Sequence, residues 1–246
     1  MPPKIPTRTR PLKDWIHQIA FLTSAARHTD LPPIGAGEIA IAGRSNAGKS
    51  SALNLICNRR RLAFSSKTPG RTQLINLFSL TDGESEVGRL VDLPGYGYAA
   101  VDRATKARWQ AELAQFLASR VSLVGLIMVM DIRHPFGPLD QQMLGWFGQR
   151  RQPLHILLTK ADKLTRNDQN KALTSAKKTI DAHQEQWGGH VTVSLFSATA
   201  RLGRDTALEK IGQWWGIHEP DNHAATDAIS VEAKKNPANE SPGGNA

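Results

Sequence analysis

The chain has little of what secreted and membrane-spanning proteins depend on. Its 246 residues include a single cysteine, Cys57, which excludes a disulfide within the chain and which we expect to be buried. The longest nearly apolar run, Val121 to Met130, is about half of the roughly 20 residues that cross a bilayer, so it predicts a buried strand. Polar residues interrupt the segment Asp14 to Ala26, unlike the apolar core of a secretory signal. We therefore expect a cytoplasmic protein.

Acidic residues are also scarce relative to basic ones. The chain has 31 Lys and Arg against 22 Asp and Glu, a formal net charge of +9. A basic body suggests a polyanionic partner, and RNA is the natural candidate in the cytoplasm. Solubility alone is the alternative explanation of the charge. Among the basic runs, we favour Arg59 to Arg61 as a contact with RNA.

Composition divides the chain into three parts. Residues 1–12 contain four prolines and predict a mobile basic arm. Residues 13–216 have the apolar content of one globular domain, which begins with a helix predicted over Lys13 to Arg27 from apolar residues at helical spacing. Residues 217–246 are rich in Ala, Asn, Pro, Gly and charge, and predict a disordered tail.

From Glu38 onward, apolar runs alternate with amphipathic segments, a pattern typical of a mostly parallel α/β sheet with helices on both faces. Only six residues join the second and third runs, so these two should form an antiparallel hairpin. The six predicted strands are Glu38–Ala42, Leu74–Leu80, Val87–Asp92, Leu123–Asp131, His155–Thr159 and Val191–Phe196. The helices predicted between and after them are Lys49–Asn58, Arg103–Ser119, Leu139–Gln149, Asp168–Trp187 and Arg204–Trp215.

The first predicted strand leads into a glycine-rich motif and then a helix. The motif is Gly43-Arg44-Ser45-Asn46-Ala47-Gly48-Lys49-Ser50. In such a loop, backbone N–H groups and the positive helix end converge on phosphate oxygens. Lys49 can reach the terminal phosphates and the Ser50 hydroxyl can bind magnesium. A nucleoside triphosphate is the predicted ligand.

Two later motifs indicate which nucleotide is bound. Asp92-Leu93-Pro94-Gly95 ends the third predicted strand, which places a carboxylate near the magnesium and a glycine N–H near the γ-phosphate. Thr159-Lys160-Ala161-Asp162 ends the fifth, where the Asp162 carboxylate can accept the N1–H and N2–H of guanine. Adenine presents an acceptor at N1, and a site built for hydrogen bonds rejects such a mismatch.

Two further segments complete the predicted site. The sixth strand ends at Phe196, and Ser197 and Ala198 follow it, where the Ala198 N–H can reach the guanine oxygen. Gly70, Arg71, Thr72 and Gln73 end a long loop that could act as a switch, with Thr72 closing on magnesium and the γ-phosphate, and Leu74, the first residue of the next strand, completes this predicted nucleotide-binding segment. An ordinary Pro-Gly turn is the alternative for this loop.

Together these motifs resemble one bacterial family. The segments Gly43 to Asn54, Thr68 to Gln73, Asp92 to Ala99 and Leu158 to Leu164 look like the EngB (YihA/YsxC) GTPases within the Era-like group. Asp131-Ile132-Arg133-His134-Pro135 fits the family's Asp-x-Arg-His-Pro segment, and the likeness extends from about Trp15 to Trp215. The resemblance implies a GTP-binding protein that assists assembly of the large ribosomal subunit and is needed for normal septation.

The residues leave the rate and the ions open. The catalytic candidates are Lys49, Thr72 and Gly95, but Tyr96 occupies the place where many GTPases carry a water-positioning glutamine. We therefore expect slow hydrolysis unless a ribosomal partner contributes. Related GTPases use an asparagine at the position of Asn46 to hold potassium, but the side chain could instead stabilise the loop. An RNA-binding scaffold in which hydrolysis is incidental is the alternative function.

Overall fold

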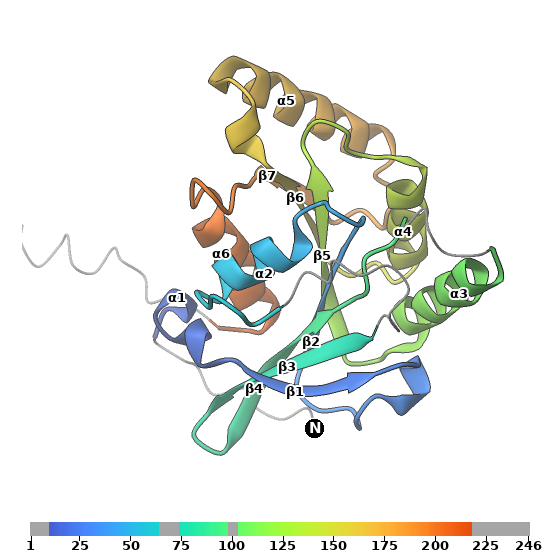
Figure 1. Cartoon of the computed structure of the whole chain (residues 1–246), viewed down its shortest axis with the longest axis vertical. Coiled ribbons are helices and arrows are strands. Elements are labelled where there is room, and N and C mark those ends of the chain that lie inside the picture. Colours follow the sequence, from blue (N-terminus) through green and yellow to red (C-terminus); the bar gives the residue numbers. More distant parts are fainter. Residues whose placement is uncertain (1–9, 64–73, 98–102, 218–246) are drawn as a thin grey trace, which may run out of the picture.

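The structure is a computed structural model that describes residues 10–63, 74–97 and 103–217. It contains one mixed sheet of seven strands in the order β1-β3-β4-β2-β5-β6-β7 (Figure 1). The strands are β1 (Ala20–Ala25), β2 (Glu38–Gly43), β3 (Ile75–Asp82), β4 (Ser85–Asp92), β5 (Leu123–Asp131), β6 (Leu154–Thr159) and β7 (Val191–Leu195). Its α-helices are α1 (Leu12–Trp15), α2 (Lys49–Ile56), α3 (Arg103–Ser119), α4 (Pro138–Gly148), α5 (Arg166–Ala182) and α6 (Arg204–Trp214). Three short 3-10 helices are η1 (Ile16–Gln18), η2 (His28–Asp30) and η3 (Ala161–Lys163).

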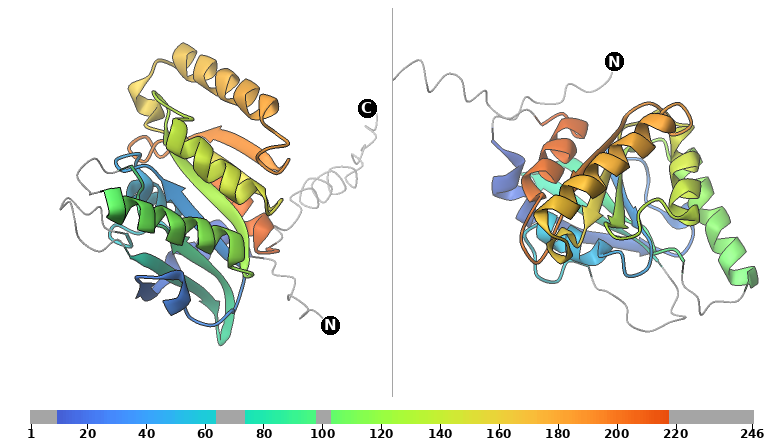
Figure 2. Two further views of the ribbon diagram at one scale, coloured as in Figure 1. Left: turned by 90° about the vertical axis from the view of Figure 1, so that its right-hand side faces the viewer. Right: turned by 90° about the horizontal axis from the view of Figure 1, so that it is seen from above.

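The predicted α/β architecture is confirmed, including the antiparallel β3–β4 hairpin and the parallel pairing of β4, β2, β5, β6 and β7. The two faces of the sheet are covered by different helices (Figure 2). One core contains side chains of α1, α2 and α6, and the other contains side chains of α3, α4 and α5. Within the described segments, no helix combines the length and the apolar character needed to span a bilayer.

The number of strands differs from the prediction, because the helix expected over Lys13 to Arg27 is mostly absent. Helical structure ends at Gln18, and Ala20–Ala25 forms the seventh strand at the sheet edge, antiparallel to β3. The Phe21 ring meets Phe78 edge-on at 6.0 Å, and the Ser24 hydroxyl donates to the Asn76 side-chain oxygen at 2.7 Å. These contacts and the ladder hydrogen bonds outweigh the weak helical pattern.

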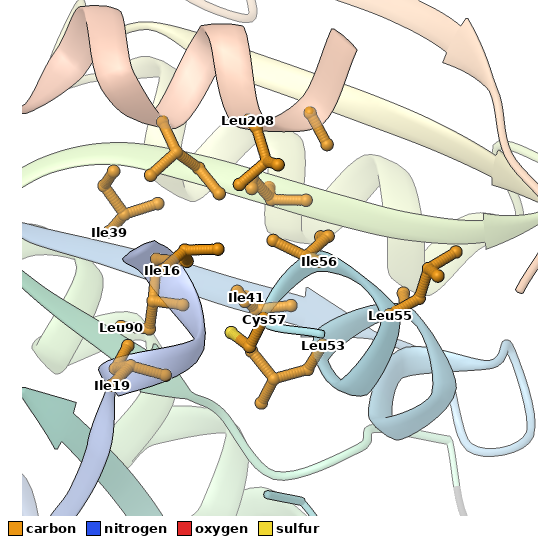
Figure 3. Close-up of a cluster of buried hydrophobic side chains, with 14 of the residues drawn as sticks. Ile16, Ile19, Ile39, Ile41, Leu53, Leu55, Ile56, Cys57, Leu90 and Leu208 are labelled. Atoms are coloured by element: carbon orange, nitrogen blue, oxygen red, sulfur yellow. The ribbon is translucent and has the colours of Figure 1, made fainter. Parts of the chain in front are cut away.

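The core beneath α2 holds the first helix of the nucleotide motif in place. Figure 3 shows Leu53 of α2 in one apolar cluster with Ile41 of β2, Ile16 of η1 and Leu208 of α6. Cys57 is fully buried in this cluster, as predicted, and burial raises the pKa of its thiol to about 12. The cysteine is therefore an apolar packing residue.

Candidate functional site

Parallel pairing brings the carboxyl ends of five strands to one edge of the sheet. The register pairs Ile41 with Asp92, Gly43 with Val129 and Asp131 with Thr159. The predicted motifs follow these strand ends, so the fold gathers segments that are far apart in the sequence. In open α/β sheets, ligands bind at this edge.

The glycine-rich loop joins β2 to α2 with a backbone that only certain residues allow. Gly48 has φ 97° and immediately precedes Lys49, the first residue of α2. A Cβ at Gly43 would lie 2.7 Å from the Val129 carbonyl oxygen, so this position has no room for a side chain. Ala47 N–H donates to the Arg44 carbonyl at 3.0 Å. The loop is thus a tight turn that opens directly into a helix N-terminus.

The Lys49 ammonium contacts the carboxylate of Asp92. Both side chains are almost buried, with 11% and 8% of their surfaces exposed. Ser50 is the next residue after Lys49 in the first turn of α2. The fold therefore brings together a cation and a carboxylate predicted from two separate motifs.

The segment after β4 is joined to β2 and to the glycine-rich loop by backbone hydrogen bonds. Leu93 N–H donates to the Ile41 carbonyl at 3.0 Å, and Ser45 N–H donates to the Tyr96 carbonyl at 2.8 Å. A Cβ on Gly95 would lie 3.6 Å from the Ser45 Cα, in ordinary contact. Gly95 is therefore connected to the glycine-rich loop through the hydrogen bonds of its neighbour Tyr96.

The Tyr96 side chain points into the protein. Its ring is 4% exposed, and its hydroxyl donates to Asp140 Oδ1 at 2.7 Å. The second oxygen of Asp140 accepts the Gly137 N–H at 2.9 Å at the start of α4. Burial, followed by the charge of Asp140, raises the pKa of Tyr96 well above its ordinary value. The phenol is therefore neutral and fully engaged in the core.

Two side chains at the end of β6 hold carbonyl groups of the glycine-rich loop. Thr159 Oγ1 lies 2.5 Å from the Ala47 carbonyl oxygen and 3.0 Å from that of Met130. Lys160 Nζ donates to the Asn46 carbonyl at 2.7 Å, from a backbone with φ 59°. The predicted base-binding and phosphate-binding segments are thus directly connected.

Asp162 and Ser197 come from the ends of neighbouring strands. Ser197 Oγ donates to Asp162 Oδ1 at 2.6 Å and accepts the Ala200 N–H at 3.0 Å. The hydroxyl lowers the pKa of Asp162, so the carboxylate is ionised. Ala161 N–H also donates to the carbonyl of the buried Phe196 at 3.1 Å, which places Ala198 on the adjoining turn.

The predicted switch segment falls almost wholly outside the described residues. Gly70, Arg71, Thr72 and Gln73 are not among them, and Leu74 is the half-buried residue that precedes β3.

One further group at this edge was missed by sequence reasoning as part of the site. Asp131, the last residue of β5, binds both Arg133 and Lys160 by its carboxylate. A polar residue at the end of an apolar strand was the available hint, but its two partners depend on the strand register.

A family model described as "50S ribosome-binding GTPase" matches residues 38–160. The probable GTP-binding protein EngB of Burkholderia cenocepacia (strain HI2424) is 52% identical over 200 residues, which cover 81% of this chain and 91% of that protein. The chain belongs to the EngB family of GTP-binding proteins. It is thereby one of the P-loop GTPases, a group that hydrolyses GTP.

Solved structures agree with EngB membership at the level of the fold. A crystal structure of a probable GTP-binding protein engB has a TM-score of 0.55 and 16% identity, covering 73% of this chain and 98% of that one. Era in complex with MgGDPNP and nucleotides 1506–1542 of 16S ribosomal RNA has a TM-score of 0.57 and 18% identity, with 76% and 59% covered. This EngB domain therefore has the fold common to these proteins.

Proposed function

We propose that this EngB protein is a GTP-dependent switch in assembly of the large ribosomal subunit. The observation that carries the proposal is the convergence of Lys49, Asp92 and Asp162 on one sheet edge. The first two suit a magnesium-bound triphosphate, and the third suits guanine. The family model's description, a ribosome-binding GTPase, supports the partner.

The phosphate end of the proposed site is formed by the loop from Gly43 to Gly48 with Lys49 and Ser50. Ser50 and Asp92 offer one hydroxyl and one carboxylate, a donor set that fits Mg²⁺, which usually binds one or two carboxylates together with substrate phosphates. Bound there, the ion would offset negative charge on the phosphate oxygens. Lys49 adds a positive charge on the same side, and Gly95 offers its N–H from the neighbouring loop.

Guanine recognition is assigned to Asp162, supported by Ala198. Ser197 holds the Asp162 carboxylate at 2.6 Å, so its orientation is fixed before a base arrives. Asp162→Asn should shift preference from guanine toward xanthine, because an amide donates where the carboxylate only accepts. The matched control is Asp181→Asn, the same change on the exposed end of α5. Unchanged guanine selectivity in the Asp162 variant would refute the assignment.

Hydrolysis is proposed to be slow in the isolated protein. Tyr96 cannot orient a water at the γ-phosphate while its hydroxyl is bound to Asp140, and Thr72 is left as the proposed switch residue. Single-turnover assays with and without ribosomal subunits test this. An intrinsic rate on the order of 1 per second would contradict it.

Asn46 carries the potassium proposal. Its carbonyl is occupied by Lys160, whereas its side chain is exposed and remains available to hold a cation against the phosphates. Turnover should then be faster in potassium chloride than in sodium chloride at equal ionic strength. Equal rates would leave Asn46 with a role in the loop alone.

The proposed partner is the large ribosomal subunit or its precursor in the cytoplasm. Normal septation would then depend on the role of the protein in ribosome assembly. Sedimentation with purified subunits in a GTP analogue, GDP and no nucleotide tests partner and switch together. Binding only with the GTP analogue supports the switch. Binding that depends on salt but ignores the nucleotide supports the scaffold alternative instead.

The domain limits belong to the same proposal. A basic arm over residues 1–12 and a tail over 217–246 would flank a monomeric GTPase domain of residues 13–216. Apart from residues 10–12 and 217, both flanking segments lie outside the described residues. Leu12 and Ile217 are buried in the core of the domain, so the test deletes residues 1–9 or residues 218–246 and repeats the sedimentation to show whether either segment contributes to ribosome binding.

A further inference from the structure

We propose that Arg133 is a positioning residue for the guanine-binding loop, acting through Asp131 on Lys160. The inference rests on the proposed guanine site and adds a residue to it. Arg133 and Asp131 both belong to the Asp-x-Arg-His-Pro segment, for which the phosphate and base motifs leave no task.

The first step is the clamp on Asp131. Arg133 Nε donates to Asp131 Oδ1 at 2.9 Å, and Arg133 Nη2 donates to Oδ2 at 2.7 Å. The Arg133 backbone N–H adds a third bond to Oδ1 at 3.1 Å. A two-pronged guanidinium contact of this kind fixes the plane of a carboxylate as well as its position.

The second step is the grip on Lys160. Strand pairing puts Asp131 opposite Thr159, so its carboxylate adjoins the next residue, Lys160. Lys160 Nζ lies 3.0 Å from Asp131 Oδ2 and 2.7 Å from the Asn46 carbonyl oxygen. The hydrogen bonds from Arg133, joined by those from Lys160, hold the pKa of Asp131 far below its usual range. The carboxylate is therefore charged whenever it meets the ammonium.

The third step is the consequence for a bound base. A free lysine side chain loses much rotamer freedom when it is ordered, whereas this one is already held at its tip. Because both partners hold the Nζ atom, the stem between the backbone and the ammonium is ordered and presents an apolar surface on which a purine can lie. Without Arg133, Asp131 could turn away and the stem would have to be ordered by the nucleotide itself.

The test measures nucleotide affinity of the full chain. Arg133→Ala should weaken the affinities for GTP and GDP by the same factor, about fivefold to tenfold, which is the size of one ordinary intramolecular hydrogen bond. Arg133→Lys should recover part of the loss, because it restores the charge without the fork. Arg108→Ala, an exposed arginine on α3, is the matched control and should leave affinity unchanged.

A double-mutant cycle separates positioning from general support. Lys160→Met keeps most of the stem but removes the ammonium, so Arg133→Ala should cost nothing further in that background. An equal loss in both backgrounds would overturn the proposal, as would a loss confined to GTP. If the parent protein does not prefer guanine to adenine nucleotides, the proposed function itself fails. If it does and Arg133→Ala binds normally, only the role of Arg133 fails.

Discussion

Tyr96 and Asp140 form a buried hydrogen bond of 2.7 Å between the loop after β4 and the first turn of α4. Burial raises the pKa of Asp140, while the Tyr96 hydroxyl and the Gly137 N–H oppose that rise. The pair thus anchors a segment beside the proposed γ-phosphate position to α4. If Gly95 moves with the nucleotide state, either the hydrogen bond between Tyr96 and Asp140 must lengthen or Asp140 must move together with Tyr96.

Tyr96→Phe is expected to lower the free energy of unfolding by about 1–3 kcal/mol, because it leaves a buried carboxylate oxygen without its donor. Urea unfolding at neutral pH measures the change. Ser119→Ala removes a hydroxyl from the exposed end of α3 and should cost about 0.5 kcal/mol or less. Equal stabilities of the two variants would show that the buried bond contributes nothing.

Gly125→Ala is expected to destabilise the protein by about 1–3 kcal/mol through overpacking. A Cβ there would collide with the Trp214 ring, which is held in place by α6. Gly145→Ala is the control, because a Cβ on this α4 residue meets nothing within 4 Å. It should stabilise the helix by about 0.5–1 kcal/mol, so thermal unfolding should move in opposite directions.

Arg120→Ala is expected to cost about 1–3 kcal/mol, because it removes both hydrogen bonds of Arg120 to the fully buried Glu38 carboxylate and leaves only Arg89 Nη1, 3.5 Å from Glu38 Oε1, as a cationic partner. Arg120 Nη2 and Nε donate to the two oxygens of Glu38 at 2.6 and 2.8 Å, and Glu38 begins β2. Arg166→Ala, at the exposed start of α5, should change little. A thermal midpoint for Arg120→Ala within the error of the control would contradict the prediction.

Stability should fall between pH 6.5 and about pH 4 through His155. The ring is 1% exposed and lies between the Thr192 hydroxyl at 2.7 Å and the Ser194 hydroxyl at 2.9 Å. Burial, aided by the charge of Lys210, lowers its pKa from 6.5 to about 4. The unfolded state therefore binds a proton that the folded state refuses, which costs up to about 3 kcal/mol at low pH.

The measurement is urea unfolding of the parent protein and His155→Gln at pH 7.5 and pH 5. The parent should lose more stability than the variant on acidification, even if the variant is weaker at both values. The same loss in both proteins would assign the acid sensitivity to other groups.

The elements after Glu38 could be predicted because their strands are short segments rich in apolar residues, and β2, β4 and β6 lead into polar motifs. The helix predicted for the N-terminal segment was wrong because a 3-10 turn buries Ile16 and Ile19, whose spacing also fits one face of an α-helix. The residues that follow instead gain ladder bonds at the edge of β3, and no local pattern specifies that pairing.

The site shows the same division. The placement of Lys49 beside Asp92 follows from topology. Asp92 ends β4, Lys49 begins the helix after β2, and β2 and β4 are parallel neighbours in the sheet. The bond of Tyr96 to Asp140 joins residues 44 positions apart, and the Phe136 ring stacks on Trp187 at 5.8 Å. Such contacts depend on how the helices pack against the sheet, and the hydrophobic periodicity of the sequence does not specify that packing.

The pairing of β1 with β3 shifts register between Phe21 and Thr23, next to two exposed apolar side chains. A strand at the border of a sheet offers unpaired N–H and C=O groups to any other extended chain. An irregularity in that row twists the border and interrupts the template. We therefore expect the irregularity in β1, the strand that completes the seven-stranded sheet, to disfavour the addition of strands from other molecules at this edge.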